Sequence, residues 1–290
     1  MRAWGRWWWP LKRVAIQLPT GSGKTVIAGS VIDKLLMTDD NKVLFVCHTK
    51  SILNQTVIRF EQDFNTSQVG DGLKDYSGWV VVATIQSLVD CPRNMFTHAI
   101  VDECHLHDTP RFKALLRRLG NARFLGLSAT MLGEPPSWVQ RVVFTQKVKP
   151  LQRQGYLAKA KVKRVKARTY RDVVKLWQRK ASDRRTIVFC KDTKQAFFVN
   201  AWMQKYGIDS ALVTKDTPQR DRDEIEREAQ VIVNCRVYKE GSDIPRIGCV
   251  VLLVSPKQQQ EFIQRVGRGT RPDTEDCLVL AFGQVHSLEV

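Results

Sequence analysis

A glycine-rich loop near the start of the chain has the composition and spacing of a phosphate-binding site. The sequence LPTGSGKT, residues 18–25, follows the apolar run RVAIQL and precedes the helix-like segment TVIAGSVIDKLL. Glycines let backbone N–H groups turn inward toward a phosphate, and the following helix N-terminus adds partial positive charge. Lys24 would reach the β- and γ-phosphates of ATP, and Thr25 would hold Mg²⁺. We predict a nucleotide site lined by Pro19, Thr20, Gly21, Ser22, Gly23, Lys24 and Thr25.

Two adjacent carboxylates end a second apolar run, HAIVDECH, at residues 98–105. At the tip of a strand, Asp102 would face Mg²⁺ while Glu103 orients or deprotonates an attacking water. Cys104, His105 and His107 follow, but the rest of the chain does not supply the second ligand pair that a zinc site usually has. The segment therefore indicates magnesium-assisted phosphoryl transfer.

A third segment, QRVGRGTRP at residues 264–272, places three arginines around two glycines. A solvated basic loop is the commoner interpretation of such a run. The alternatives are a clip for a nucleic-acid backbone and one half of a chemical site whose other parts lie far away in the sequence. The cluster alone does not decide between them.

The elements that would position these segments alternate between strand and helix, twice along the chain. Runs that are apolar on both faces predict central strands of parallel sheets, and the stretches between them have helical spacing. The predicted strands are RVAIQL, KVLFVC, WVVVAT, HAIVD and FLGLS in the first half and RTIVFC, DSALV, AQVIVNC, CVVLLV and CLVLAF in the second. We predict an α/β fold of two domains, 1–152 and 153–290, because the pattern lapses over residues 146–168.

The overall composition favours a polyanionic partner. The 290 residues include 46 Lys and Arg against 29 Asp and Glu, which gives a formal charge of +17. Seven scattered cysteines within apolar runs indicate buried reduced thiols rather than a disulfide framework. No apolar run approaches the roughly 18 residues of a membrane helix, and MRAWGRWWWP is too short and too arginine-rich for a signal peptide. We expect a cytoplasmic protein.

Two further segments leave alternatives open. Residues 159–185 hold twelve Lys and Arg and two acids, and they form either a solvated strand edge and helix face or a patch that contacts a nucleic-acid backbone. The tryptophans of WWWP, residues 7–10, either cover the first sheet or take a base-stacking or strand-wedge role.

The order of these motifs resembles the superfamily 2 helicases, over nearly the whole chain. LPTGSGKT is similar to motif I, CHTKSILNQ (47–55) to Ia, ATIQSL (83–88) to Ib, DECH (102–105) to II and SAT (128–130) to III. IVFC (187–190) resembles motif IV, VYKEGSDIP (237–245) motif V and QRVGRGTRP motif VI. Within the superfamily, the residues of these motifs are similar to those of bacterial RadD-like DNA repair helicases and of phage helicases such as UvsW.

The resemblance implies two tandem RecA-like domains with ATP between them, and it implies roles for particular residues. Arg268 and Arg271 would point at the γ-phosphate, Gln264 would contact that phosphate or the water, and Gly241 and Asp243 would lie near the ribose. The implied nucleic-acid contacts are Thr49, Lys50, Thr84, Gln86 and Lys191.

The function implied is that of an ATP- and Mg²⁺-dependent helicase or translocase on DNA, in repair, recombination or replication. We expect a monomer in the cytoplasm of a bacterial or phage-infected cell. An RNA helicase is the nearest alternative, because a motor core contacts the backbone and separates DNA from RNA through few 2′-OH contacts. An ATP-gated clamp or annealing module that binds without processive unwinding is the alternative from another class.

Overall fold

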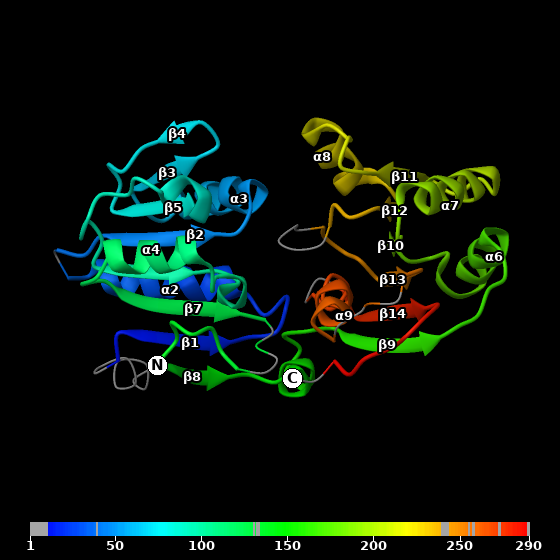
Figure 1. The fold of residues 1–290 in the computed structure, drawn as a ribbon. Coiled ribbons are helices and arrows are strands. Elements are labelled where there is room, and N and C mark those ends of the chain that lie inside the picture. Colours follow the sequence, from blue (N-terminus) through cyan, green and yellow to red (C-terminus); the bar gives the residue numbers. More distant parts are fainter. Residues whose placement is uncertain are drawn as a thin grey trace. The chain divides into compact units, whose positions relative to one another are not determined.

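The chain divides into two compact α/β units. The computed structural model describes residues 11–38, 40–129, 131, 134–238, 244–254, 256, 259–271 and 274–288. The first unit contains Gly23–Lys147 with the strand that precedes the glycine loop, and the second contains Val148–Glu289 with Thr20–Ser22 (Figure 1). The predicted boundary after residue 152 falls inside a helix, α5 (Val148–Arg153), and stays a prediction. WWWP lies outside the described residues.

An eight-stranded sheet forms the first unit, in the order β4-β3-β5-β2-β6-β7-β1-β8. Every neighbouring pair is parallel except the β3–β4 hairpin, which is antiparallel. The strands are β1 (Arg13–Gln17), β2 (Val43–Cys47), β3 (Thr66–Gly70), β4 (Leu73–Lys74), β5 (Val80–Thr84), β6 (His98–Val101), β7 (Arg123–Ser128) and β8 (Arg141–Thr145). A parallel order brings the carboxyl ends of β1, β6 and β7, where motifs I, II and III begin, to one edge of the sheet.

Helices cover both faces of this sheet, which explains why its central strands are apolar throughout. Val14 and Ile16 pack in the core beneath α2 (Lys24–Leu36) and α3 (Lys50–Phe60). Ala15, between them in the same strand, packs in the opposite core with α4 (Pro110–Arg118) and the short 3₁₀ turn η1 (Ile85–Leu88). A second 3₁₀ turn, η2 (Cys104–Leu106), follows β6.

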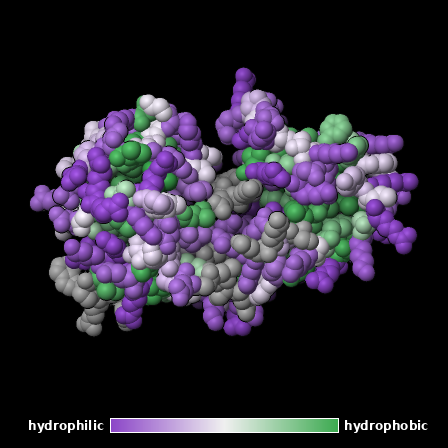
Figure 2. All heavy atoms as spheres, viewed as in Figure 1, coloured by the Kyte–Doolittle hydropathy of each residue, from purple (hydrophilic) through white to green (hydrophobic). Residues whose placement is uncertain are grey.

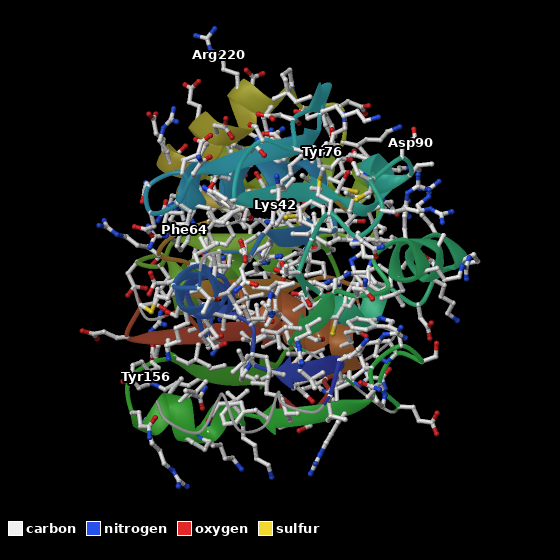
Figure 3. The ribbon with its side chains drawn as sticks, turned by 90° about the vertical axis from the view of Figure 1, so that its left-hand side faces the viewer. Lys42, Phe64, Tyr76, Asp90, Tyr156 and Arg220 are labelled. Atoms are coloured by element: carbon white, nitrogen blue, oxygen red, sulfur yellow. The ribbon has the colours of Figure 1, made fainter. Side chains whose placement is uncertain are left out.

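Side chains fix the starts of these helices and one connection between strands. The hydroxyls of Thr49 and Thr109 accept hydrogen bonds from backbone N–H groups three residues further on, which caps α3 and α4. Lys42, just before β2, donates from Nζ to the carbonyl of Tyr76, and both residues are labelled in Figure 3. That bond holds the segment between β4 and β5 against the sheet.

A six-stranded, fully parallel sheet forms the second unit, in the order β11-β12-β10-β13-β14-β9. Its strands are β9 (Lys159–Arg164), β10 (Thr186–Phe189), β11 (Ser210–Val213), β12 (Val231–Asn234), β13 (Cys249–Leu252) and β14 (Asp276–Ala281). One face packs against α6 (Tyr170–Ala181) and α7 (Thr193–Lys205), and the other against α8 (Gln219–Glu228) and α9 (Gln259–Val266).

The predicted fold class is confirmed, and all ten predicted strands are present. The sequence pattern missed four strands, β3, β4, β8 and β9. Polar residues interrupt β3 and β9, β4 has only two residues, and β4, β8 and β9 are edge strands. The basic stretch 159–185 contains the edge strand β9 and helix α6, and its contact with a nucleic-acid backbone stays a prediction. All seven cysteines are buried and free of disulfides. Among the described residues, no helix is long and apolar enough to cross a membrane.

Candidate active site

The glycine loop has the backbone shape that phosphate binding requires. Leu18 donates its backbone N–H to the carbonyl of Ser128 at 2.8 Å, which holds the end of β1 against β7. Gly21 and Gly23 both adopt φ of +81°, a region that L-residues with a side chain rarely enter. Helix α2 starts at Lys24 with Gly23 as its N-cap and no side-chain cap. The first N–H groups of α2 are therefore available to an anion.

Two hydroxyls in the loop indicate that this site fits a polar ligand. The Oγ1 atom of Thr20 and the Oγ atom of Ser22 are buried, and neither has a hydrogen-bond partner among the described residues. Buried polar atoms are normally paired, since leaving one unpaired costs about 1–3 kcal/mol. These hydroxyls can donate hydrogen bonds to phosphate oxygens, so the residues present fit a nucleoside triphosphate.

Lys24 and Glu103 form the centre of the site. Lys24 Nζ lies 3.3 Å from Glu103 Oε1, and the two side chains are only 12% and 14% exposed. His105 Nδ1 lies 3.5 Å from Glu103 Oε2 and 2.7 Å from Ser128 Oγ. The structure thus joins the loop of motif I, the acid of motif II and the serine of motif III into one chain of polar contacts.

The environment of Glu103 keeps its carboxylate ionised. Burial by itself would raise the pKa of Glu103, but the charge of Lys24, the nearby His105 and hydrogen bonds from Lys24 and the Ala129 N–H lower the pKa below its usual value. An ionised carboxylate beside the phosphate loop has the protonation state that a general base or a water-orienting group needs.

The backbone at motif II is strained. Glu103 has φ of 44° and ψ of 49°, the left-handed region that is uncommon for residues other than glycine. The backbone N–H of Asp102 donates to the carbonyl of Val46 at 3.0 Å, which continues the strand to its tip. Strain of this kind persists where the surroundings hold it, and it occurs often at active sites. The turn aims Glu103 at Lys24 and separates it from Asp102.

Cys104 reaches its buried position because β7 carries a glycine opposite it. A Cβ atom on Gly126 would lie 2.8 Å from Cys104 Sγ and 2.9 Å from Cys104 Cβ, closer than real side chains approach. The thiol is fully buried, and burial raises its pKa far above the usual value. Cys104 therefore acts as a small packing residue beneath the acid.

The described residues include no group of three or more His, Cys, Asp or Glu that could hold a metal ion. His105 is engaged with Glu103 and Ser128, and the ring of His107 stacks on Phe112 with centroids 5.5 Å apart. These histidines belong to the acid site and to the core. The assignment of Thr25 and Asp102 to Mg²⁺ stays a prediction.

The second unit presents its own set of buried polar groups at the end of α9. Gln264 and Arg268 are 8% and 4% exposed, and Gln264 Nε2 has no hydrogen-bond partner among the described residues. Arg271 donates from Nη1 to the carbonyl of Ile244 at 3.3 Å. Arg265 instead pairs with Glu261 and lies over the ring of Phe189, 5.3 Å from its centroid, so it supports the unit from within.

The predicted nucleic-acid contacts differ in how accessible they are. Gln86 is exposed, and Lys50 and Lys191 point mostly into solvent, where they pair with Asp71 at 2.9 Å and Asp192 at 3.7 Å. Thr49 uses its hydroxyl to cap α3, and Thr84 is buried with its hydroxyl 2.8 Å from that of Ser87. Gly241 and Asp243 lie outside the described residues. All of these roles stay predictions.

Sequence reasoning missed several residues that shape this site. The motifs include His105 and Ser128 but do not indicate the hydrogen bond that joins them. No motif indicates Gly126, which makes room for Cys104, or Asp71, which pairs with Lys50. A glycine within an apolar strand run was an available signal for Gly126, because such a glycine often marks a close approach.

Two protein families match the two halves of the chain. The family "Type III restriction enzyme, res subunit" matches residues 9–132, and "Helicase conserved C-terminal domain" matches residues 166–273. Two yeast proteins named as ATP-dependent helicases, irc3 of Schizosaccharomyces pombe and IRC3 of Saccharomyces cerevisiae, are 26% and 24% identical over 93% and 96% of this chain. The alignments cover 54% and 49% of those proteins, so this chain spans about half of their length.

Solved structures share the fold. The helicase MrfA bound to DNA superposes with a TM-score of 0.76 at 15% identity, over 95% of this chain and 44% of that one. Dbp5 of S. cerevisiae, bound to RNA and ADP BeF3, gives a TM-score of 0.68 at 14% identity, over 96% of this chain and 80% of that one. The site and these matches define two RecA-like units of the helicase type, and the two family matches with the helicase relatives support a superfamily 2 helicase. Its particular similarity to RadD-like and UvsW-like proteins stays a prediction.

Proposed function

We propose that this chain is a nucleic-acid-dependent ATPase that acts as a DNA helicase or translocase. The observation that carries the proposal is the pairing of Lys24 with an ionised Glu103 at 3.3 Å, beside a glycine loop in which the hydroxyls of Thr20 and Ser22 have no partner in the described part of the chain. Because Lys24 and Glu103, 79 positions apart, converge on a phosphate-type loop, the arrangement supports phosphoryl transfer rather than a chance glycine turn.

ATP with Mg²⁺ would supply the transferable γ-phosphoryl group and the cation that neutralises its charge. The loop N–H groups and Lys24 would bind the phosphates, while Thr25 and Asp102 would hold the metal ion. Glu103 would orient the attacking water and accept its proton, since its carboxylate is kept ionised. Arg268, Arg271 and Gln264 would stabilise the charge that develops on the γ-phosphate.

DNA is the proposed polymer. Among relatives, a protein named "DNA 3'-5' translocase XPB2" from Sulfurisphaera tokodaii is 22% identical over 94% of this chain and 78% of its own length. A formal charge of +17 favours a polyanion through counterion release. The site residues would couple hydrolysis to motion on the strand by changing their grip on its backbone. Cytoplasmic location in a bacterial or phage-infected cell and a monomeric state stay predictions.

ATPase rates on a panel of polynucleotides test this proposal. Single-stranded, duplex, forked and four-way DNA would be compared with RNA of matched sequence, followed by strand displacement on the forked substrate. We expect DNA to stimulate hydrolysis more than RNA does. Hydrolysis that no polynucleotide stimulates would refute the motor, greater stimulation by RNA would make it an RNA helicase, and stimulation without strand release would indicate a translocase or clamp.

An arginine variant tests the role of motif VI. Arg268→Ala should leave ATP affinity nearly unchanged and lower the DNA-stimulated rate of hydrolysis by about 10³-fold. An arginine that contacts a transferring phosphoryl group raises kcat by about 10³- to 10⁵-fold. Arg220→Ala is the matched control, since Arg220 is an exposed arginine of α8 (Figure 3). Equal turnover in the two variants would remove Arg268 from the site.

A further inference from the structure

An aromatic and basic surface lies on α6 and α7 of the second unit. We define it by eight residues of α6 and α7 and the turn that ends α7: Tyr170, Arg171, Lys194, Phe197, Phe198, Trp202, Lys205 and Tyr206. In the space-filling view, hydrophobic residues lie among hydrophilic ones over these two helices (Figure 2). The motifs of the ATP site do not account for this surface.

Two of the five rings are exposed, whereas those of Tyr170, Trp202 and Tyr206 are half-buried and pack against the core of the unit. Phe197 and Phe198 are 59% and 41% exposed, although neighbours on the opposite side of α7, such as Val199 and Met203, are fully buried. Large apolar side chains that are exposed in clusters mark interaction sites more often than single ones do. Two adjacent phenylalanines on the solvent side of a helix therefore indicate an interaction site. The hydrophobic core of this unit does not require either ring.

The two helices hold these rings in an ordered array. Tyr170 of α6 stacks on Phe198 of α7 with centroids 6.1 Å apart and planes 12° from parallel, and Phe197 meets Phe198 edge-on at 5.8 Å. Further along α7, Trp202 and Tyr206 lie 6.1 Å apart. Arg171 donates from Nε to Tyr206 Oη at 3.0 Å, which ties the two helices together. The array is thus fixed before any partner arrives.

Positive charge accompanies the rings. Lys194 precedes Phe197 and Phe198 by three and four residues and so lies on the same side of α7. Lys205 places its ammonium over the Trp202 ring, 5.0 Å from the centroid. The nearby carboxylates of Asp172 and Asp192 are occupied as helix caps, each accepting a backbone N–H at the start of its helix. The basic stretch 159–185, which includes Arg171, leads into the same surface.

We infer that this aromatic and basic surface binds single-stranded nucleic acid, with bases stacking on the rings of Phe197, Phe198 and Tyr170 and phosphates pairing with Lys194, Arg171 and Lys205. Surfaces for single strands combine cations that follow the backbone with aromatic rings on which bases stack, and both are present here. The inference rests on the proposed function and adds to it a base-contacting site, whereas motif contacts in the core address the backbone. An acidic protein segment would also pair with the cations, but its carboxylates would not stack on the aromatic rings.

The decisive probe is an oligonucleotide without bases. Fluorescence anisotropy would measure the binding of oligo-dT and of an abasic oligodeoxynucleotide of equal length to the full chain, each over a range of salt concentrations. We expect the wild type to prefer oligo-dT, and Phe197→Ala/Phe198→Ala to weaken oligo-dT binding about tenfold while leaving abasic binding unchanged, since one stacked base contributes about 1–3 kcal/mol. Phe197→Leu/Phe198→Leu keeps the apolar surface without rings and should behave like the alanine pair.

Two further measurements separate this inference from the proposed function. Lys194→Gln/Lys205→Gln should weaken both oligonucleotides alike and reduce the salt dependence, since it removes phosphate contacts only. The Phe197→Ala/Phe198→Ala variant should keep the maximal DNA-stimulated ATPase rate but need about tenfold more DNA to reach it. If the wild type does not respond to DNA, the proposed function fails. If it responds and the double alanine variant binds oligo-dT as tightly as the wild type does, this inference alone is wrong. A leucine pair that binds oligo-dT like the wild type would refute stacking.

Discussion

Removing Lys24 should destabilise the first unit as well as stop hydrolysis, and the size of the effect follows from the geometry. Lys24 Nζ lies 3.3 Å from Glu103 Oε1 with both side chains largely buried. Lys24→Ala would leave the Glu103 carboxylate without its main counter-charge in a site that burial already makes unfavourable. Removing one partner of a buried ion pair lowers the free energy of unfolding by about 3–5 kcal/mol. Because both side chains keep a small exposure, we expect a loss of about 3 kcal/mol.

A double-mutant cycle with Glu103→Gln isolates that cause. Glutamine has nearly the same shape as glutamate but no charge, so the uncompensated carboxylate disappears. We expect Lys24→Ala/Glu103→Gln to recover at least about 1 kcal/mol relative to Lys24→Ala, although neither variant hydrolyses ATP. Urea denaturation would be followed by the fluorescence of Trp79 and Trp138, which lie in the first unit. Additive free energies of unfolding would refute the account of this pair.

The pH dependence of the same variant gives a second check with a definite sign. In Lys24→Ala, burial still raises the pKa of Glu103, but the Lys24 charge that lowers this pKa is gone. The pKa of Glu103 in the folded state should therefore rise above its value in the unfolded state. The folded state then binds more protons than the unfolded state, and stability increases as the pH falls. The stability gap to the wild type should therefore narrow between about pH 8 and about pH 5. A gap that is constant or widens would contradict the argument.

Three further predictions follow from contacts outside that pair. Gly126→Ala should destabilise the first unit by about 1–3 kcal/mol in urea denaturation, because its Cβ would lie 2.8 Å from Cys104 Sγ, whereas Gly120→Ala, whose nearest neighbour would be 3.6 Å away, should change little. Asp71→Asn should raise DNA affinity several-fold in anisotropy titrations by releasing Lys50 and Asn54, and an equal gain from Asp63→Asn would show a general charge effect instead. Burial, with His48 and His105 nearby, lowers the pKa of His107 to about 4. On acidification the unfolded chain therefore takes up this proton before the folded protein does. The free energy of unfolding should fall by up to about 3 kcal/mol between about pH 6.5 and about pH 4. A slope in the His107→Gln variant as steep as the wild type's would refute the last prediction.

Apolar periodicity and motif order were enough to predict the fold class and the phosphate loop. The reason is local: KVLFVC and TIVFC are apolar on both faces, and in a soluble α/β fold only a central parallel strand satisfies that pattern. The strand β9 was missed for the opposite reason. At the edge of a sheet KAKVKR exposes one row of lysines, and its pairing with β14, more than 100 residues later, leaves no trace in the local pattern.

The candidate site shows the same limit at the level of side chains. The types of Lys24 and Glu103 could be read from their motifs, but the ionised state of Glu103 depends on three groups that come from different segments: Lys24, His105 and the N–H of Ala129. His105 is oriented in turn by Ser128, so motif III acts on the acid of motif II through a histidine. A motif list places these residues in order along the chain. Only the convergence of β1, β6 and β7 at one sheet edge places them within hydrogen-bonding distance, and that convergence makes motif III a positioning element for Glu103.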